Sequence, residues 1–141
     1  MPDPVVLFAM VILLVPMGYF LLAAPAFLFV RLDIPPVTVL LRGMFKAYFL
    51  VLATTAVIGA IAFLLEGRFV VALGVGVIAA AAILVRPRFL QQMDAELSAR
   101  DAGDRDAVRR LRGLHWAGML CNAIALAAVV ISIPYIAAAP A

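Results

Sequence analysis

The chain has 141 residues, of which 67% are hydrophobic and only 13% are charged, with a formal net charge of +3. A soluble domain carries about twice that share of charge, so the apolar side chains exceed what one aqueous core could bury, and lipid is their natural solvent. The positive charge indicates basic anchors at a membrane surface rather than a nucleic-acid-binding protein.

Four apolar segments divide the sequence, and charged residues separate them. They cover about residues 5–30, 47–65, 69–85 and 113–136. A helix needs about 20 apolar residues to cross the hydrocarbon, and these segments are longer than the roughly ten residues of a barrel strand. The sequence therefore predicts a single all-α membrane domain over residues 1–141, folded as a four-helix transmembrane bundle.

Prolines and one glycine predict local breaks in this helical pattern. The first span opens with Met-Pro-Asp-Pro, which lacks the positive segment of a cleaved signal peptide. Pro16 and Pro25 in that span, and Pro134 in the fourth, each remove a backbone donor and should bend their helices. The turn Glu66-Gly67-Arg68 should place Gly67 in the left-handed conformation that ends a helix.

Basic residues lie almost entirely on one side of the four spans. Only Arg68 lies on the other side. The remaining ten are Arg31, Arg42 and Lys46 between spans one and two, and Arg86, Arg88, Arg100, Arg105, Arg109, Arg110 and Arg112 between spans three and four. The positive-inside rule makes their side cytoplasmic. Both termini are therefore predicted on the non-cytoplasmic side of a bacterial inner (cytoplasmic) membrane.

A short helical hairpin is predicted on the cytoplasmic side, formed by the arm at 86–112. Span three should continue past the membrane, break at Asp101-Ala-Gly-Asp104 and return as span four, with Asp104 as the N-cap. Pro35-Pro36 predicts a helix start, and a helix from there through Leu65 would be about 45 Å long, so its first turns should also protrude. The arm could bind a partner or serve as a solvated connection. The residues expected to meet lipid headgroups are Arg42, Lys46, Arg109 and Arg110.

Small residues recur four apart on two of the predicted helices. Such rows allow helix backbones to approach closely in lipid, where van der Waals packing drives association. The predicted packing positions are Gly113, Ala117, Cys121 and Ala125 in span four, and Ala72, Gly76 and Ala80 in span three. Cys121 is the only cysteine, so no intramolecular disulfide can form, and we interpret it as a packing residue.

Span four also carries a polar stripe of Arg112, His115, Met119 and Asn122, which share one helix face. Asn122 needs a hydrogen-bond partner, and Thr54 and Thr55 are candidates. The favoured interpretation is interhelical hydrogen bonding; the alternative is a site for metal, haem or quinone, or for proton transfer. One histidine and one cysteine do not make a closed metal site, so no metal site and no cofactor are predicted.

Three segments together resemble the small four-helix membrane proteins typified by eukaryotic transmembrane protein 205, a family of unknown biochemical function. The segments are AAPAFLFVRLDIPPVTVLLRGMFKAYF, the Arg-Pro-Arg at 86–88, and LRGLHWAGMLCNAIAL, in which His115 and Asn122 are seven apart. The resemblance covers nearly the whole chain. It implies a small residue after the histidine, and Trp116 departs from that. It implies no defined chemistry.

The leading functional expectation is non-enzymatic, because no catalytic groups converge in the pattern. We expect a small structural or accessory subunit that packs against a larger inner-membrane complex or against a second copy of itself. The alternative is a small-molecule or metal-handling membrane protein, for transport or tolerance, centred on His115 and Asn122. A redox or haem protein comes third, because one histidine per chain gives bis-histidine ligation only if a dimer shares the haem.

Overall fold

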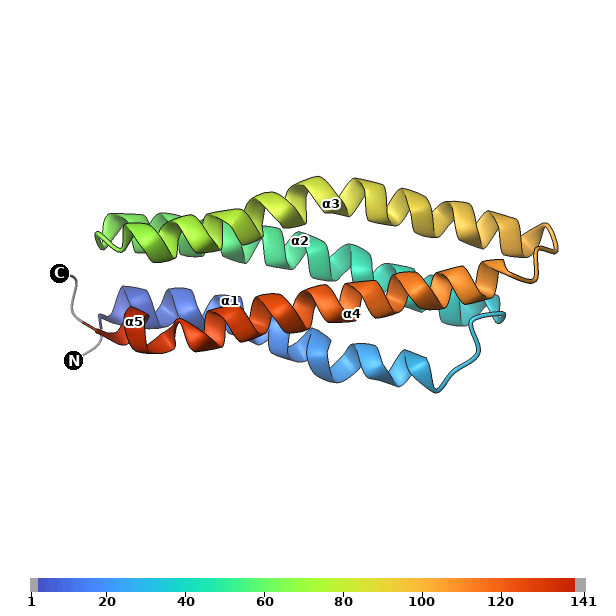
Figure 1. Cartoon of the computed structure of the whole chain (residues 1–141), viewed down its shortest axis with the longest axis horizontal. Helices are drawn as coiled ribbons and strands as arrows, with labels where there is room; N and C mark the ends of the chain where they lie inside the picture. The colour runs from blue at the N-terminus through green and yellow to red at the C-terminus, as the bar shows by residue number, and fades with distance from the viewer. Residues whose placement is uncertain (1–2, 139–141) are drawn as a thin grey trace.

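The computed structural model describes residues 3–138, which are all-α (Figure 1). Met1 and Pro2 of the opening segment lie outside the described residues. The elements are α1 (Pro4–Ala23), the 3-10 helix η1 (Ala24–Leu28), α2 (Pro35–Leu65), α3 (Phe69–Asp101), α4 (Ala107–Ile131) and α5 (Ile133–Ala137). Four of the helical segments in residues 3–138 are long and apolar enough to cross a membrane, which confirms the all-α, four-helix prediction.

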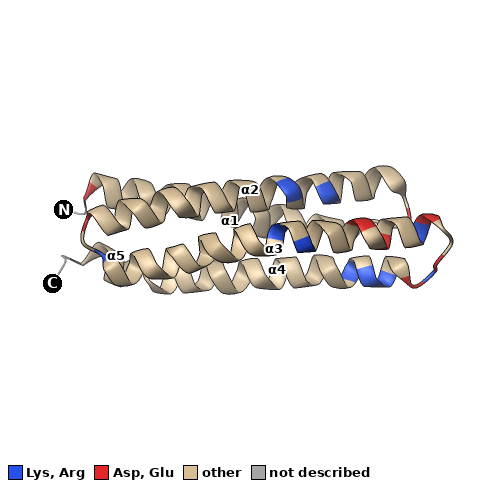
Figure 2. Cartoon of the chain, turned by 90° about the horizontal axis from the view of Figure 1, so that it is seen from above, with Lys and Arg blue, Asp and Glu red and all other residues tan. Residues whose placement is uncertain are grey.

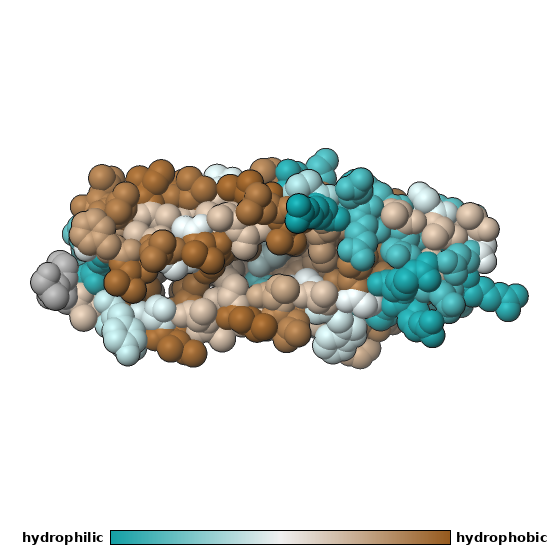
Figure 3. Space-filling model, turned by 45° about the horizontal axis from the view of Figure 1, so that its top comes forward, coloured by the Kyte–Doolittle hydropathy of each residue, from teal (hydrophilic) through white to brown (hydrophobic). Residues whose placement is uncertain are grey.

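The helices run up and down along one long axis, so that both ends of the described chain lie together (Figure 1). The neighbours in the bundle are α1 with α2, α2 with α3, α3 with α4, and α4 with α1. Charged residues gather mostly toward the end opposite the termini, which we call the polar end (Figure 2). Elsewhere the face shown in Figure 3 is mainly apolar, and all four long helices expose large hydrophobic side chains, as expected of a multi-pass membrane protein.

Two glycines with positive φ end α2 and α3, at the turn and at the break that the sequence predicts, although a left-handed conformation is predicted only for Gly67. Gly67 has φ 72° and follows α2, and Gly103 has φ 93° and follows α3. The N–H of Arg68 donates to Phe63 O at 2.8 Å, and the N–H of Asp104 donates to Ala99 O at 3.0 Å. Both arrangements are Schellman motifs, which satisfy the last carbonyl groups of a helix and reverse the chain.

The helical hairpin of α3 and α4 at the polar end is present, and it packs against the start of α2. Arg42 of α2 pairs with Asp94 of α3. Arg100 at the end of α3 donates to Leu32 O at 3.2 Å and to Thr38 Oγ1 at 2.8 Å. At 31 and 33 residues, α2 and α3 are about 45–50 Å long, which exceeds the roughly 30 Å of hydrocarbon. The surplus length forms this ion-paired extension.

The N-cap prediction is wrong by two residues. Asp106 is the N-cap of α4, and its side chain makes no capping hydrogen bond. Asp104 instead accepts the N–H of Asp106 at 2.8 Å, within the turn. Arg110 donates to Asp104 and to Glu96, each at 2.7 Å. The hydrogen bond from Arg110 is the main reason that the pKa of Asp104 lies below its ordinary value.

The four basic residues expected at lipid headgroups therefore have different roles. Arg42 and Arg110 form ion pairs that join helices of this chain. Arg109 is highly exposed and lies 3.2 Å from Asp106. Lys46 is exposed and makes no ion pair within residues 3–138. Headgroup contact remains a prediction, and Lys46 and Arg109 have the exposure that it requires.

An aromatic cluster occupies the core where α1, α2 and α3 meet. Phe20 of α1 stacks on Tyr48 of α2, with ring centroids 4.0 Å apart, and Phe45 lies 4.7 Å from Phe89 of α3. Gly118 of α4 closes this cluster. A Cβ placed there would lie 2.3 Å from Phe45 Cε1, so only glycine lets α4 approach the fully buried ring.

Most of the small-residue rows do not pack the helices of this chain together. On α4, Gly113, Ala117 and Cys121 are exposed and Ala125 is half-buried. On α3, Ala72 is buried, Gly76 half-buried and Ala80 exposed. The close contact involves another glycine, Gly118 against Phe45, whereas a Cβ added at Gly59 would lie at an ordinary packing distance of 3.6 Å from Val75 Cγ1. The exposed members are left for a partner or for lipid.

Replacing Gly118 with alanine should destabilise the bundle by about 1–3 kcal/mol, because the methyl group would overlap the Phe45 ring, which has no room to move. Thermal unfolding in mild detergent, followed by circular dichroism, measures the loss. Gly113→Ala is the matched control, since a Cβ there meets no atom within 4 Å. Equal unfolding temperatures for the two variants would contradict the packing described above.

Candidate functional site

The polar residues of the stripe lie on one side of α4, and this side meets α1 and η1. His115 is 0% exposed and Asn122 is 2% exposed, while Arg112 and Met119 are partly buried. The structure therefore brings the stripe into the bundle interior. The contacts of these side chains in the interior distinguish a structural role from a ligand-binding role.

Asn122 is a junction between three helices. The hydroxyl of Tyr48 on α2 donates to Asn122 Oδ1 at 2.5 Å, and Asn122 Nδ2 donates to the carbonyl of Met17 on α1 at 3.1 Å. Thr54 and Thr55 instead donate to carbonyls of their own helix, at 2.9 Å from Leu50 O and Val51 O respectively. The prediction that one of these threonines pairs with Asn122 is therefore wrong.

His115 joins α4 to the start of η1. Its Nε2 lies 2.9 Å from Ala24 O. A carbonyl oxygen only accepts, so Nε2 carries the proton and donates. Phe27 and Phe45 approach the imidazole edge to face, with centroids 6.2 Å and 6.0 Å away. Nδ1 is buried and has no hydrogen-bond partner within residues 3–138.

Arg112 completes the series at the end of η1. Its guanidinium donates to Phe27 O at 2.7 Å and to Val30 O at 3.0 Å. The carbonyl groups that end a helix have no intrahelical donor, and a basic side chain near them is favourable. Arg112, His115 and Asn122 thus all donate to backbone carbonyls of the segment between Met17 and Val30.

The change of backbone from α1 to η1 explains why most of these carbonyl groups need donors from another helix. The α-helix ends at Ala23 and gives way to the 3-10 turns of η1, so Ala24 O, Phe27 O and Val30 O lie where regular α-helical bonding stops, whereas Met17 O lies inside α1. In a bilayer, irregular backbone is tolerated only where protein groups satisfy it. The polar stripe of α4 supplies such groups, so its chemistry matches a helix-joining role.

Sequence reasoning missed Tyr48, Gly118 and Arg100. Tyr48 lies in an aromatic segment of the sequence, Phe45 to Phe49, which could have drawn attention to it. No sequence pattern indicates that its hydroxyl reaches Asn122, 74 residues further along the chain. Gly118 lies outside the row of small residues spaced four apart. Arg100 was counted only as one of many basic residues, although its side chain is 10% exposed.

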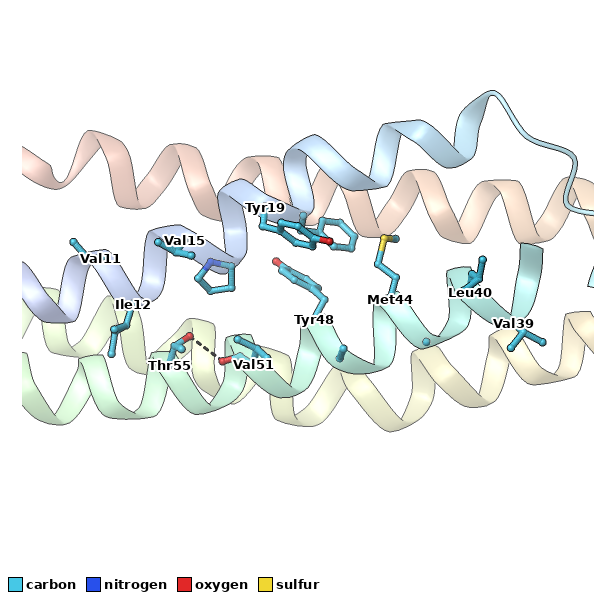
Figure 4. Close-up of a pocket in the computed structure, with 14 residues that line it drawn as sticks. Val11, Ile12, Val15, Tyr19, Val39, Leu40, Met44, Tyr48, Val51 and Thr55 are labelled. Atoms are coloured by element: carbon cyan, nitrogen blue, oxygen red, sulfur yellow. Dashed lines mark hydrogen bonds between the residues drawn. The ribbon is translucent and has the colours of Figure 1, made fainter. Parts of the chain in front are cut away.

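Apolar hollows occur on several faces of the bundle. The largest, of about 870 Å³, lies between α1 and α2 (Figure 4). One of about 660 Å³ lies between α2 and α3 and includes Ala72, Gly76 and Ala80. One of about 590 Å³ lies mainly between α3 and α4 and includes Cys121 and Ser132. One of about 440 Å³ lies beside Trp116 and Ala117. None of the four is lined by a charged side chain.

Metal ligands do not cluster in the described part of the chain. Within residues 3–138, no group of three or more His, Cys, Asp or Glu side chains is placed to hold a metal ion.

Comparison with protein-family models, curated proteins and solved structures found no match to this chain. The resemblance to the transmembrane protein 205 family therefore stays a hypothesis that rests on the three sequence segments alone.

Removing the Tyr48 hydroxyl should weaken the bundle through Asn122. A double-mutant cycle of Tyr48→Phe and Asn122→Ala should give a coupling free energy of about 1 kcal/mol, because each side chain loses its partner when the other is changed. Reversible unfolding in mixed micelles measures it. The cycle of Tyr19→Phe with Asn122→Ala should show no coupling, since Tyr19 is largely exposed. Equal coupling in both cycles would contradict the assignment.

Proposed function

We propose that the protein is a non-enzymatic structural or accessory membrane subunit, which packs against a larger inner-membrane complex or against a second copy of itself. The observation that carries the proposal is a division of surfaces. Polar side chains of α4 donate hydrogen bonds to this chain's own backbone, whereas small residues of the same helix face outward.

The outward face of α4 supports association in the membrane. Gly113, Ala117 and Cys121 follow one another every four residues and are exposed. Small side chains allow a neighbouring helix to approach closely, which is the main source of helix association in lipid. Ala117 also borders the hollow beside Trp116, and Cys121 borders the one between α3 and α4. A partner helix would gain contact area in both.

The proposed location is the bacterial inner membrane, with the polar end in the cytoplasm and both termini outside. The support is the positive-inside rule applied to the ten basic residues gathered toward the polar end. On this orientation the ion-paired hairpin of α3 and α4 stands in the cytoplasm, where it could touch the soluble part of a partner.

One observation favours the second candidate, a small-molecule or metal-handling protein. Nδ1 of His115 is buried without a partner within residues 3–138, and an unpaired nitrogen is a possible ligand to a metal ion. Its neighbours are the apolar rings of Phe27 and Phe45. Because no second metal ligand is seen beside it, the structural role is preferred.

The test is extraction of the native particle in mild detergent, followed by mass spectrometry of the intact assembly. The proposal expects a stoichiometric protein partner or a second copy, and expects Ala117→Phe to release it by filling the close-approach face. Ala47→Phe is the matched control, because Ala47 is an exposed alanine on α2 that lines the hollow between α1 and α2 and not the α4 face.

A particle that runs as a lone monomer would contradict the proposal. A monomer carrying a metal ion or small molecule, lost in His115→Ala while Ala117→Phe keeps it, would favour the second candidate instead.

A further inference from the structure

The largest hollow of the molecule is an open groove on the outer face of α1 and α2 (Figure 4). Its volume is about 870 Å³. Val15, Tyr19 and Pro16 line it from α1, and Gly43 and Met44 line it from α2. Val15 and Tyr19 are largely exposed, so the groove opens toward the surrounding lipid rather than into the bundle.

The lining offers almost nothing to a polar ligand. Two of its three hydroxyl groups are already engaged, since Tyr48 donates to Asn122 and Thr55 donates to Val51 O. No charged side chain lines it. A polar solute would lose its hydration there without new hydrogen bonds, so the chemistry selects an apolar occupant.

The dimensions favour a thin, extended occupant over a helix. The lining runs from Val39 to Thr55 on α2, which is about 24 Å along the helix axis. The volume spread over that length gives an average cross-section of about 36 Å², whereas a helix with its side chains is roughly 10–12 Å across and needs more than twice that area. A helix of a second copy would therefore enter the groove with only part of its width, whereas a thinner apolar chain fills it.

A cationic side chain lies beside the groove on α2. Lys46 is exposed, makes no ion pair within residues 3–138, and follows Val39 by seven residues on the same side of the helix. Side chains on a helix lean toward its N-terminus, so the Lys46 ammonium extends toward the polar end, where headgroups meet water. One leaflet of hydrocarbon is about 15 Å thick, which the groove more than spans.

We propose that the groove between α1 and α2 is a binding site for one acyl chain of an anionic phospholipid, drawn from the leaflet at the polar end, with Lys46 beside the phosphate. This proposal does not depend on the accessory-subunit function, because the groove and the small-residue face of α4 use different residues.

The test is native mass spectrometry of protein moved from nanodiscs of phosphatidylethanolamine and phosphatidylglycerol into mild detergent. Wild type should retain one phosphatidylglycerol per chain. Gly43→Leu should lower that occupancy several-fold, because its side chain enters the groove while an added Cβ meets no atom within 4 Å. Gly113→Leu is the matched control, on an open position outside the described hollows, and should retain the lipid. Circular dichroism checks that both variants fold.

A second variant separates the headgroup from the chain. Lys46→Ala should keep an acyl chain in the groove but lose the preference for phosphatidylglycerol over phosphatidylethanolamine. Equal lipid retention by Gly43→Leu and Gly113→Leu would overturn the site, and an unchanged preference in Lys46→Ala would overturn the anionic headgroup. Loss of a second protein chain, rather than of a lipid, in Gly43→Leu would show that the groove is a dimer surface and overturn the proposal.

Discussion

The structure depends on a constraint that the bilayer imposes, namely that polar groups within the hydrocarbon must find partners inside the protein. The α1–η1 segment changes from α-helix to 3-10 turns after Ala23. Three side chains of α4, Arg112, His115 and Asn122, donate hydrogen bonds to its carbonyl groups. Asn122 also receives the Tyr48 hydroxyl, so one amide fixes α4 against both α1 and α2. The approach of Gly118 to Phe45 requires that placement.

The two ends of the bundle are held together by different forces. Toward the termini, buried apolar side chains such as Phe63 and Val75 hold the helices together. At the polar end, ion pairs such as Arg42 with Asp94 tie the hairpin to α2. Ion pairs that face lipid would be costly, whereas half-exposed ion pairs in water are tolerated. The position of the charged residues therefore marks where the apolar part of the bundle ends and the ion-paired extension begins. Two surfaces take no part in these contacts. We propose the small-residue row of α4 for a protein partner and the groove between α1 and α2 for a lipid.

Much of the fold follows from the sequence, because bilayer thickness sets helix length and charges set helix ends. The helix from Pro35 through Leu65 and the left-handed Gly67 were predictable from local rules. The partners of Asn122 were not, since a period of 3.6 residues gives a face but not the neighbour it meets. The same limit explains the α4 row: residues four apart share a face, and only the three-dimensional arrangement shows that Gly118 is packed while Cys121 is exposed.

His115 acts as a structural donor to Ala24 rather than as a ligand-binding group. The chain has one histidine, so nitrogen-15 labelling of histidine gives one imidazole in a solid-state NMR spectrum of the protein in bilayers. We expect a protonated Nε2 with the shift of a hydrogen-bonded N–H, and an unprotonated Nδ1 whose shift does not change when zinc or a membrane extract is added. A protonated Nδ1 with a bare Nε2, or an Nδ1 shift that follows an added ligand, would contradict this role.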